Sequence, residues 1–193
     1  FIFKNRSPSS GMERVKVYSE NGMPRKAGVG VFARVFMEHF PLLPTEEEGR
    51  LHDPRLRDNF VERIFTLRRW RSDVLDSPSP SRLVTFHTDH KLLLMSHSSE
   101  HARKLGRLTA SVKTRPFDQI LHEYEATMLR CLKLIATVRK NTNVLQHAAG
   151  HLKELISGDE RAELSETIMQ YHAGQVPLVV PLTLIRHYIR KHK

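Results

Sequence analysis

Histidine is the residue type that could do most chemistry in this chain, and four of the 12 histidines fall in one short stretch. They lie between residues 85 and 108, among lysines and arginines and beside a short apolar run: His87, His90, His97 and His101. At about 100° per residue, they would share one face if a single helix ran through the stretch. Neighbouring serines favour a cap instead, so we expect a helix break near His97. Either arrangement predicts a basic, histidine-lined surface beside an apolar one.

Two histidine pairs have the spacing of helical metal ligands. His97 and His101, like His147 and His151, are four residues apart, which lets two imidazoles reach one metal ion. Neither pair has the glutamate that follows the first histidine in a metalloprotease helix, and no cysteine accompanies them. The alternative is that these histidines complete a polar core or face phosphates. A Ser-His-Asp triad lacks a supporting Gly-x-Ser-x-Gly motif.

The charge balance is strongly basic. The chain has 193 residues, with 31 lysines and arginines against 21 acidic residues and a net charge of +10. Such a field favours polyanions such as RNA, although a basic surface without a nucleic-acid role is the alternative. Aromatic residues make up only 7%, so base stacking would rest on few side chains. We expect phosphate contacts from five basic residues: Arg68, Arg69, Lys91, Arg103 and Lys104.

Localisation is predicted to be cytoplasmic, with no membrane partner. No apolar run approaches the ~20 residues needed to span a bilayer, and the first residues lack a signal-peptide layout. The single cysteine, Cys131, fits a reducing compartment. It falls on the apolar stripe of a predicted helix, which indicates a buried hydrophobic residue rather than a nucleophile. Because the chain opens with Phe1 on a strand-like segment, we expect a fragment of a longer protein.

The first part of the chain is predicted to be a partial α/β segment, residues 1–75. Local patterns predict short strands at residues 1–3 and 15–18, a loop at 20–26 and an apolar helix at 31–40. Three adjacent carboxylates at 46–48 are typical of a solvated turn, although two of them on a strand could flank a site. Asp53 and Pro54 then begin an amphipathic, basic helix that reaches Arg71.

The second part, residues 76–193, is predicted to be an all-helical domain of five or six helices, so the fold class is mainly α. The Pro- and Ser-rich segment 76–81 marks the boundary between the two parts. Periodicity and capping residues predict a helix over 83–95, a second from Ser98 or Ser99 toward 113, and a third that begins after Pro116. A fourth is expected from an Asn141 or Asn143 cap to Gly158, a fifth from an Asp159 cap to 174, and a last one over 182–193. Residues 176–181 are predicted to be an apolar crossing.

Several motifs resemble known families. Residues 7–18, with 28–33 and 44–51, resemble the C-terminal half of the thiouracil desulfidase family. From about residue 55 onward the chain is similar to the YbgA-type helical domain. The motifs that carry this second resemblance are His87-Thr-Asp-His-Lys91, Ser96-His97-Ser98, Lys104-Leu-Gly106, Asn143-Val-Leu-Gln-His147, Gly150 and Pro181 to Tyr188. The two domains fused are the arrangement of bacterial tRNA 4-thiouridine desulfidases.

This resemblance implies non-redox removal of sulfur from thiolated uridine on a four-iron four-sulfur cluster held by three cysteines. The family's turn reads Ser-Pro-Ser-Cys-Gly, and here Ser10 stands at the cysteine position. Serine is a poor substitute for a soft thiolate at iron. Ser7, the family's hydroxyl beside the substrate, is retained. The resemblance therefore predicts Ser7 near the base, Ser10 at a lost ligand position, and a chain that holds no cluster and is inactive alone.

The resemblance also implies two partners, namely tRNA, held by the helical domain, and the missing N-terminal half of the desulfidase domain. We expect five polar residues to line the helical cleft: His87, His97, Asn143, His147 and His187. A non-catalytic helical module that binds nucleic acid or protein is the alternative. A metal-dependent hydrolase built on the histidine pairs is a third hypothesis, and stoichiometric zinc or manganese would support it.

Overall fold

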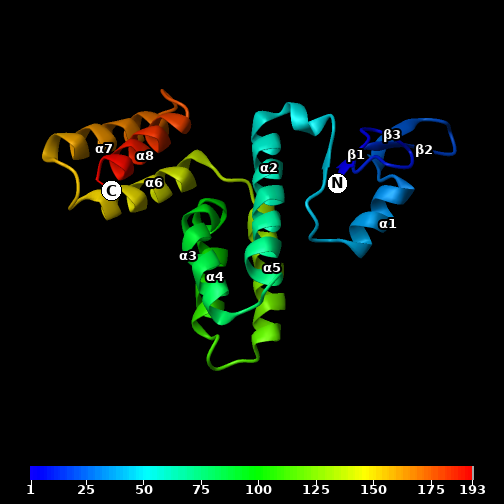
Figure 1. Cartoon of the computed structure of the whole chain (residues 1–193). Helices are drawn as coiled ribbons and strands as arrows, with labels where there is room; N and C mark the ends of the chain where they lie inside the picture. The colour runs from blue at the N-terminus through cyan, green and yellow to red at the C-terminus, as the bar shows by residue number, and fades with distance from the viewer. Residues whose placement is uncertain (193) are drawn as a thin grey trace.

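The computed structural model of the chain describes residues 1–192, and it consists mainly of helices with a small α/β portion at the N-terminus (Figure 1). This architecture confirms the predicted fold class. The α/β portion lies at one end of the molecule, a central group of helices follows, and the last three helices form a group on the far side (Figure 1). No helix among the described residues is both long and apolar enough to cross a membrane.

The α/β portion has two separate pairs of strands and one helix. β1 (Ile2–Phe3) pairs in parallel with β4 (Glu46–Glu47), which is distant in sequence. β2 (Val15–Tyr18) and β3 (Pro24–Gly28) form an antiparallel hairpin. The loop predicted to run through residue 26 therefore ends earlier. Gly22, with φ of 73°, lets the chain turn tightly enough for Tyr18 to pair with Pro24. Helix α1 (Val31–His39) follows as predicted.

Four helices and one π-helical turn surround the first hydrophobic core. They are α2 (Pro54–Arg69), the turn Trp70–Leu75, α3 (Pro80–His97), α4 (Ser99–Ala110) and α5 (Phe117–Lys133). Asp53 caps α2 and Ser79 caps α3, each followed by a proline that suits the first turn. The break expected near His97 is confirmed, because Ser98 ends α3 and caps α4. Trp70, Leu94 and Tyr124 are among the fully buried side chains that fill this core.

The last three helices enclose a second core: α6 (Val138–Leu152), α7 (Gly158–His172) and α8 (Val179–Lys191). The starts of all three helices differ from the predictions, and in α6 and α7 the reason is that other caps are used. Thr137, rather than an asparagine, caps α6, and Ser157 with Glu160 forms a capping box at α7. Pro181 lies in the first turn of α8, where no amide hydrogen is needed, so the apolar crossing is partly helical.

The two cores meet where the chain passes from α5 to α6. The Lys140 ammonium of α6 donates to the His97 carbonyl of α3 at 2.6 Å, and within the first group the Asn59 amide of α2 donates to the Leu132 carbonyl near the end of α5 at 3.0 Å. Helix α3 also packs against α6. Residues that the domain prediction places before position 76 thus pack into the helical core, with Leu67 and Trp70 as examples. The division at residues 75 and 76 remains a prediction.

Candidate functional site

The turn that contains Ser7 and Ser10 is fastened to the start of α1. The Ser7 hydroxyl accepts a hydrogen bond from the Ser10 amide at 3.1 Å, so the structure brings these two predicted residues together. The Ser9 carbonyl accepts from the amides of Phe32 and Ala33 at 3.0 and 3.2 Å. A Cβ at Gly30 would collide with that carbonyl, which explains the glycine before the helix. The turn is therefore held by backbone contacts that leave its serine side chains at a partly exposed edge.

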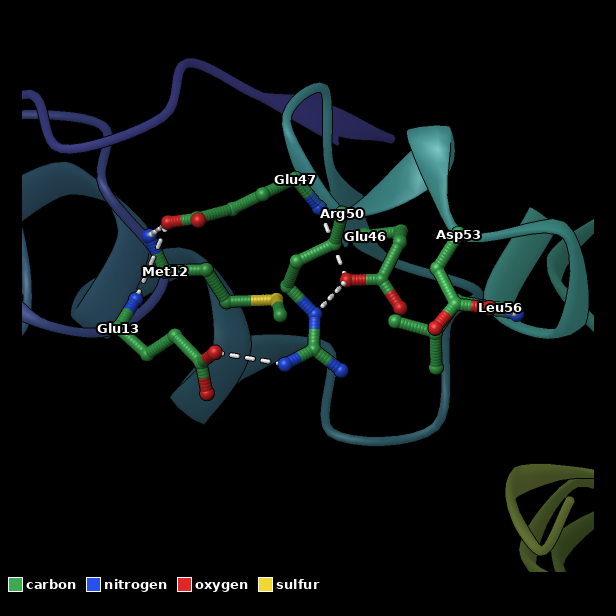
Figure 2. A network of polar contacts seen from close by, with 7 residues as sticks. All are labelled: Met12, Glu13, Glu46, Glu47, Arg50, Asp53 and Leu56. Atoms are coloured by element: carbon green, nitrogen blue, oxygen red, sulfur yellow. Dashed lines mark hydrogen bonds and ion pairs between the residues drawn. The ribbon is translucent and has the colours of Figure 1, made fainter.

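Two of the three carboxylates at 46–48, Glu46 and Glu47, belong to a polar network (Figure 2), whereas Glu48 is exposed and pairs with Lys4. Glu47 is buried, and its Oε1 accepts from the amides of Met12 and Glu13, which ties β4 to the segment after the serine turn. Glu46, also buried, accepts from Arg50 Nε at 2.6 Å, and Arg50 Nη1 donates to Glu13 at 2.6 Å. The sequence left open whether two of the acids lay on a strand, and they do.

The charges of this network support one another. Partial burial lowers the pKa of Arg50, but the hydrogen bonds to Glu46 and Glu13 outweigh it and raise the pKa above its ordinary value. Beside the network is a cavity of about 220 Å³ with three further cations on its wall, Arg6, Arg14 and Lys26. Arg6 and Arg14 both have φ of 56°, an unusual conformation for a residue with a side chain. Together with Arg50, these cations outnumber the two carboxylates of the cavity wall, Glu13 and Glu47.

The residues present do not fit a four-iron four-sulfur cluster. Ser10 offers a hydroxyl where a soft thiolate would be needed. The one thiol, Cys131, is buried in the first helical core, where burial raises its pKa to about 11 and its Sγ donates to the Leu94 carbonyl. Within residues 1–192, no three or more His, Cys, Asp or Glu side chains gather to share a metal ion. The prediction that Cys131 is a buried hydrophobic residue is confirmed.

A second candidate site is a cavity of about 520 Å³ between α3, α4 and α6, which we call the α3–α4–α6 cleft. The structure brings five of the predicted site residues together on its walls: His87, Lys91, Arg103, Asn143 and His147. His87 and Lys91 are one helical turn apart on α3, as are Asn143 and His147 on α6. Met95 and Ala102 add an apolar surface between these polar groups.

The cations of the α3–α4–α6 cleft have no acidic partner. Neither Lys91 nor Arg103 forms an ion pair with any residue that the structure describes, and the Arg103 Nε donates only to the Ser99 carbonyl at 3.2 Å. His87 Nδ1 lies 3.0 Å from the Tyr124 hydroxyl. Burial, with the charge of Lys91, lowers the pKa of His87 and favours the neutral ring. The cleft therefore offers hydrogen-bond donors and positive charge to a ligand.

Two of the predicted cleft residues lie elsewhere. His97 is fully buried, with Nδ1 2.6 Å from the Leu134 carbonyl and Nε2 3.3 Å from the Glu62 carboxylate. It lies at the end of α3, so its ring meets the α5–α6 connection instead of the cleft. His101 Nδ1 lies 3.0 Å from the Ser98 hydroxyl, so the two members of that histidine pair have separate partners. His187 is exposed on α8, beside Tyr188.

The other predicted phosphate contacts lie on different surfaces. Lys104 lines a cavity of about 180 Å³ on another flank of α4, together with Arg107 and Arg130. Arg68 lines a cavity of about 400 Å³ where α2 meets the α/β portion, and Arg69 is exposed on α2. The contact between His87 and Tyr124 also escaped prediction, because 37 residues separate them and no local pattern joins them.

Comparisons with known proteins match two separate parts of the chain to two different families. Residues 1–48 match the family described as 2-thiouracil desulfurase, and residues 91–193 match the family described as protein of unknown function (DUF1722). The uncharacterized protein YbgA of Escherichia coli (strain K12) is 31% identical over 136 residues, which cover 70% of this chain and 80% of that protein. No solved structure matches the chain. The match over more than half of its length shows that the chain belongs to the DUF1722 family, here preceded by a segment similar to 2-thiouracil desulfurase.

Proposed function

We propose that this protein takes part in removing sulfur from thiolated uridine in tRNA, with its helices binding the RNA. The observation that carries the proposal is a pair of unpaired cations, Lys91 and Arg103, in a cleft of a chain whose first 48 residues match 2-thiouracil desulfurase. Cations without acidic partners gain little inside the free protein, whereas phosphates release counterions on binding them. A tRNA substrate would also place the protein in the cytoplasm.

Helix α4 is the centre of the proposed RNA-binding surface. Arg103 faces the α3–α4–α6 cleft, while Lys104 and Arg107 face the cavity on another flank of the same helix, opposite Arg130 of α5. With 12 residues, α4 is about 18 Å long. Cations on two of its flanks could therefore contact phosphates at more than one point along the RNA. Aromatic side chains are scarce on these walls, which favours recognition through charge and shape.

The α/β portion would contribute the substrate side of the reaction. Ser7 and Ser10 belong to the turn that resembles the desulfidase turn, and the nearby Arg6 and Arg14 would attract a phosphate of the substrate. The four-iron four-sulfur cluster that the resemblance implies needs thiolates that this chain does not supply. We therefore propose that this chain is inactive alone and that the cluster ligands belong to another polypeptide segment.

An apolar surface on the α/β portion is the proposed contact with that segment. Ile2 of β1 and three residues of α1 are exposed large hydrophobic side chains: Val31, Phe32 and Val35. Among the described residues, β1 has β4 as its one strand partner, so its other edge is not paired in a sheet. Unpaired edges and exposed apolar residues favour association with a further structural layer. The remaining half of a desulfidase domain is the partner that the family match favours.

The test is tRNA binding by the whole chain at two salt concentrations, with two double variants. Lys91→Ala/Arg103→Ala removes the cations of the cleft, and Lys153→Ala/Arg161→Ala removes two exposed cations from the second helical group. We expect wild-type affinity to fall steeply with salt, the cleft variant to bind about tenfold more weakly, and the control to stay within about twofold. Equal affinities of the two double variants would contradict the proposal.

A non-catalytic RNA-binding role is the second candidate function. The observation in its favour is that the glutamates nearest the serine turn already have partners: Glu47 binds two backbone amides, and Glu13 and Glu46 bind Arg50. Such acids are not free to act as general acid or base. Addition of a cysteine-bearing desulfidase half distinguishes the two candidates. Release of sulfide from thiolated tRNA favours desulfidation, and binding without release favours the second role.

A further inference from the structure

Tyr124 has one hydrogen-bond partner, and that partner lies in the α3–α4–α6 cleft. The tyrosine is fully buried, and its ring stacks on Trp70 with centroids 5.1 Å apart and planes 14° apart. Within the described part of the chain, its hydroxyl bonds to His87 Nδ1 alone, at 3.0 Å. Burial raises the pKa of Tyr124, so the phenol keeps its proton. A buried hydroxyl proton without an acceptor is costly, and the Nδ1 lone pair is the acceptor within reach.

This contact fixes the proton on the other ring nitrogen of His87. A neutral imidazole accepts at Nδ1 only when Nε2 carries the hydrogen, because one nitrogen is always the donor. A charged imidazole would carry hydrogens on both nitrogens, and the Tyr124 hydroxyl would lose its acceptor. The lowered pKa of His87 agrees with the neutral ring. Nε2–H is therefore a hydrogen-bond donor held in a fixed orientation.

Gly106 of α4 keeps that donor uncovered. A Cβ added at Gly106 would lie 3.5 Å from His87 Nε2, and no other atom outside its own helix lies within 4 Å of that position. Glycine in the middle of a helix is less favourable than alanine. The glycine thus weakens α4 locally, yet it leaves Nε2 open toward the cleft. A ligand acceptor could occupy the space that a methyl group would take.

We propose that the α3–α4–α6 cleft holds one unstacked nucleotide of the bound RNA, with its phosphate on Lys91 and Arg103 and a base carbonyl oxygen on His87 Nε2–H. This inference rests on the proposed RNA binding and adds a base-recognising donor to it. Tyr124 acts as a positioning residue because it does not line the cleft and its hydroxyl bonds to His87, which does. Three donors facing one cavity suit a ligand rich in acceptors, and uracil has two carbonyl oxygens.

The size and walls of the cleft agree with a nucleotide. Its volume of about 520 Å³ falls in the range of small-ligand sites. Met95 and Ala102 provide an apolar surface for the face of a base, while the Asn143 amide can both donate to and accept from a base edge. His147 completes the wall from α6. A single-stranded or flipped nucleotide presents these edges, whereas a paired one does not.

The first experiment compares two ligands and two glycine variants of the whole chain. Uridine 5′-monophosphate and ribose 5-phosphate are titrated while the ring nitrogens of His87 are followed by NMR. We expect the nucleotide to bind more tightly than the sugar phosphate and to shift the Nε2 signal. Gly106→Ala should weaken nucleotide binding about tenfold, whereas Gly150→Ala, in an open position on α6, should change it less than about twofold. Equal effects of the two variants would overturn the inference.

The second experiment tests the role of Tyr124 through the tautomer itself. Tyr124→Phe keeps the buried ring but removes the hydroxyl, so the nitrogen signals of His87 should move from those of an Nε2–H ring toward a mixture of tautomers. His87→Gln can place an amide donor where Nε2–H lies and should retain part of the nucleotide affinity that His87→Ala loses. An unchanged tautomer in Tyr124→Phe, or equal losses in both His87 variants, would overturn the assignment.

The failure of this inference is distinguishable from that of RNA binding. If tRNA binds and the Lys91→Ala/Arg103→Ala variant weakens it, while Gly106→Ala leaves both tRNA and nucleotide binding unchanged, the RNA proposal stands and base recognition by His87 is wrong. If tRNA does not bind at low salt, the RNA proposal fails and this inference fails with it. Nucleotide binding without tRNA binding also contradicts it, because the nucleotide was inferred to belong to RNA.

Discussion

The two polar regions of this molecule differ in whether their charged side chains have partners within the protein. In the α/β portion, Glu46, Arg50 and Glu13 form a chain of hydrogen bonds, and Glu47 is held by two backbone amides (Figure 2). In the α3–α4–α6 cleft, Lys91 and Arg103 face a cavity with no acid beside them. Removal of one partner from a buried charge network destabilises the fold, because the remaining charges are left unsatisfied. Cations without partners contribute little to the fold and are available to a ligand.

This difference separates charged residues that maintain the fold from those that are available to bind a ligand. The three adjacent glutamates are prominent in the sequence, yet two of them serve the architecture of the α/β portion. Lys91 and Arg103 are ordinary surface cations in the sequence, and only the packing of α3, α4 and α6 places them together. Substitutions in the network should therefore change stability, and substitutions in the cleft should change binding.

The largest expected effect is on stability, when the polar network around Arg50 is broken. Arg50→Ala leaves the buried Glu46 and the half-buried Glu13 without their cation, so the local stability of the α/β portion should fall by about 3 kcal/mol. Hydrogen exchange of the Met12, Glu13 and Glu47 amides measures this loss. Lys4→Ala is the control, because its pair with Glu48 is exposed and should contribute less than about 1 kcal/mol. Similar losses of stability in the two variants would show that the buried network contributes no more than an exposed ion pair.

The next largest effect is expected when Arg103 is given an acidic partner. Ser99→Glu adds an acid in the first turn of α4, four residues before Arg103, where it can pair with the guanidinium. The free protein should be as stable as the wild type or slightly more stable, while tRNA affinity should fall about tenfold. Ser165→Glu on α7 makes the same change of net charge at an exposed position and should have a smaller effect. Greater loss from Ser165→Glu would contradict the location of the site.

A smaller effect concerns pH. Because the pKa of His87 is lowered in the folded protein, the unfolded chain takes up a proton first as pH falls. The contribution of His87 to stability is therefore complete above its ordinary value of 6.5 and is lost progressively below it. His87→Gln should lessen the decline in stability between pH 7.5 and pH 5, measured by urea unfolding. His151→Gln, which removes an exposed histidine, is the control, and an equal change there would contradict the role of burial.

Much of the fold could be predicted because its signals are local. The caps at Asp53, Ser79 and Ser98 set the starts of three helices, and each uses a side-chain oxygen a few residues from the amide it binds. The caps of α6 and α7 were misjudged because several capping residues compete in each segment. Thr137 and Ser157 were chosen over the asparagines and Asp159, and the flanking Glu160 of the capping box was the available clue.

The site was only partly predictable because its geometry depends on contacts between distant residues. The identities of His87, Lys91 and His147 suggested a basic cleft, and their shared cavity depends on α6 packing against α3. His97 has the same side chain, yet it lies beside the carbonyl of Leu134. A sequence pattern cannot separate these two histidines, since the difference arises from where the chain turns after α5.

The smallest expected effect separates the cleft from the rest of the basic surface. Arg68 and Arg69 belong to α2, and Arg68 lines a cavity beside Phe1 and Leu43 instead of the α3–α4–α6 cleft. Their predicted phosphate contacts would then depend on RNA that extends beyond α4. Arg68→Ala/Arg69→Ala should weaken tRNA binding by about twofold, with a smaller change in salt dependence than Lys91→Ala/Arg103→Ala produces, because the slope reports the phosphates contacted directly. If the α2 variant loses as much affinity as the cleft variant, the RNA follows a wider surface, and unpaired charge alone would not identify where it binds.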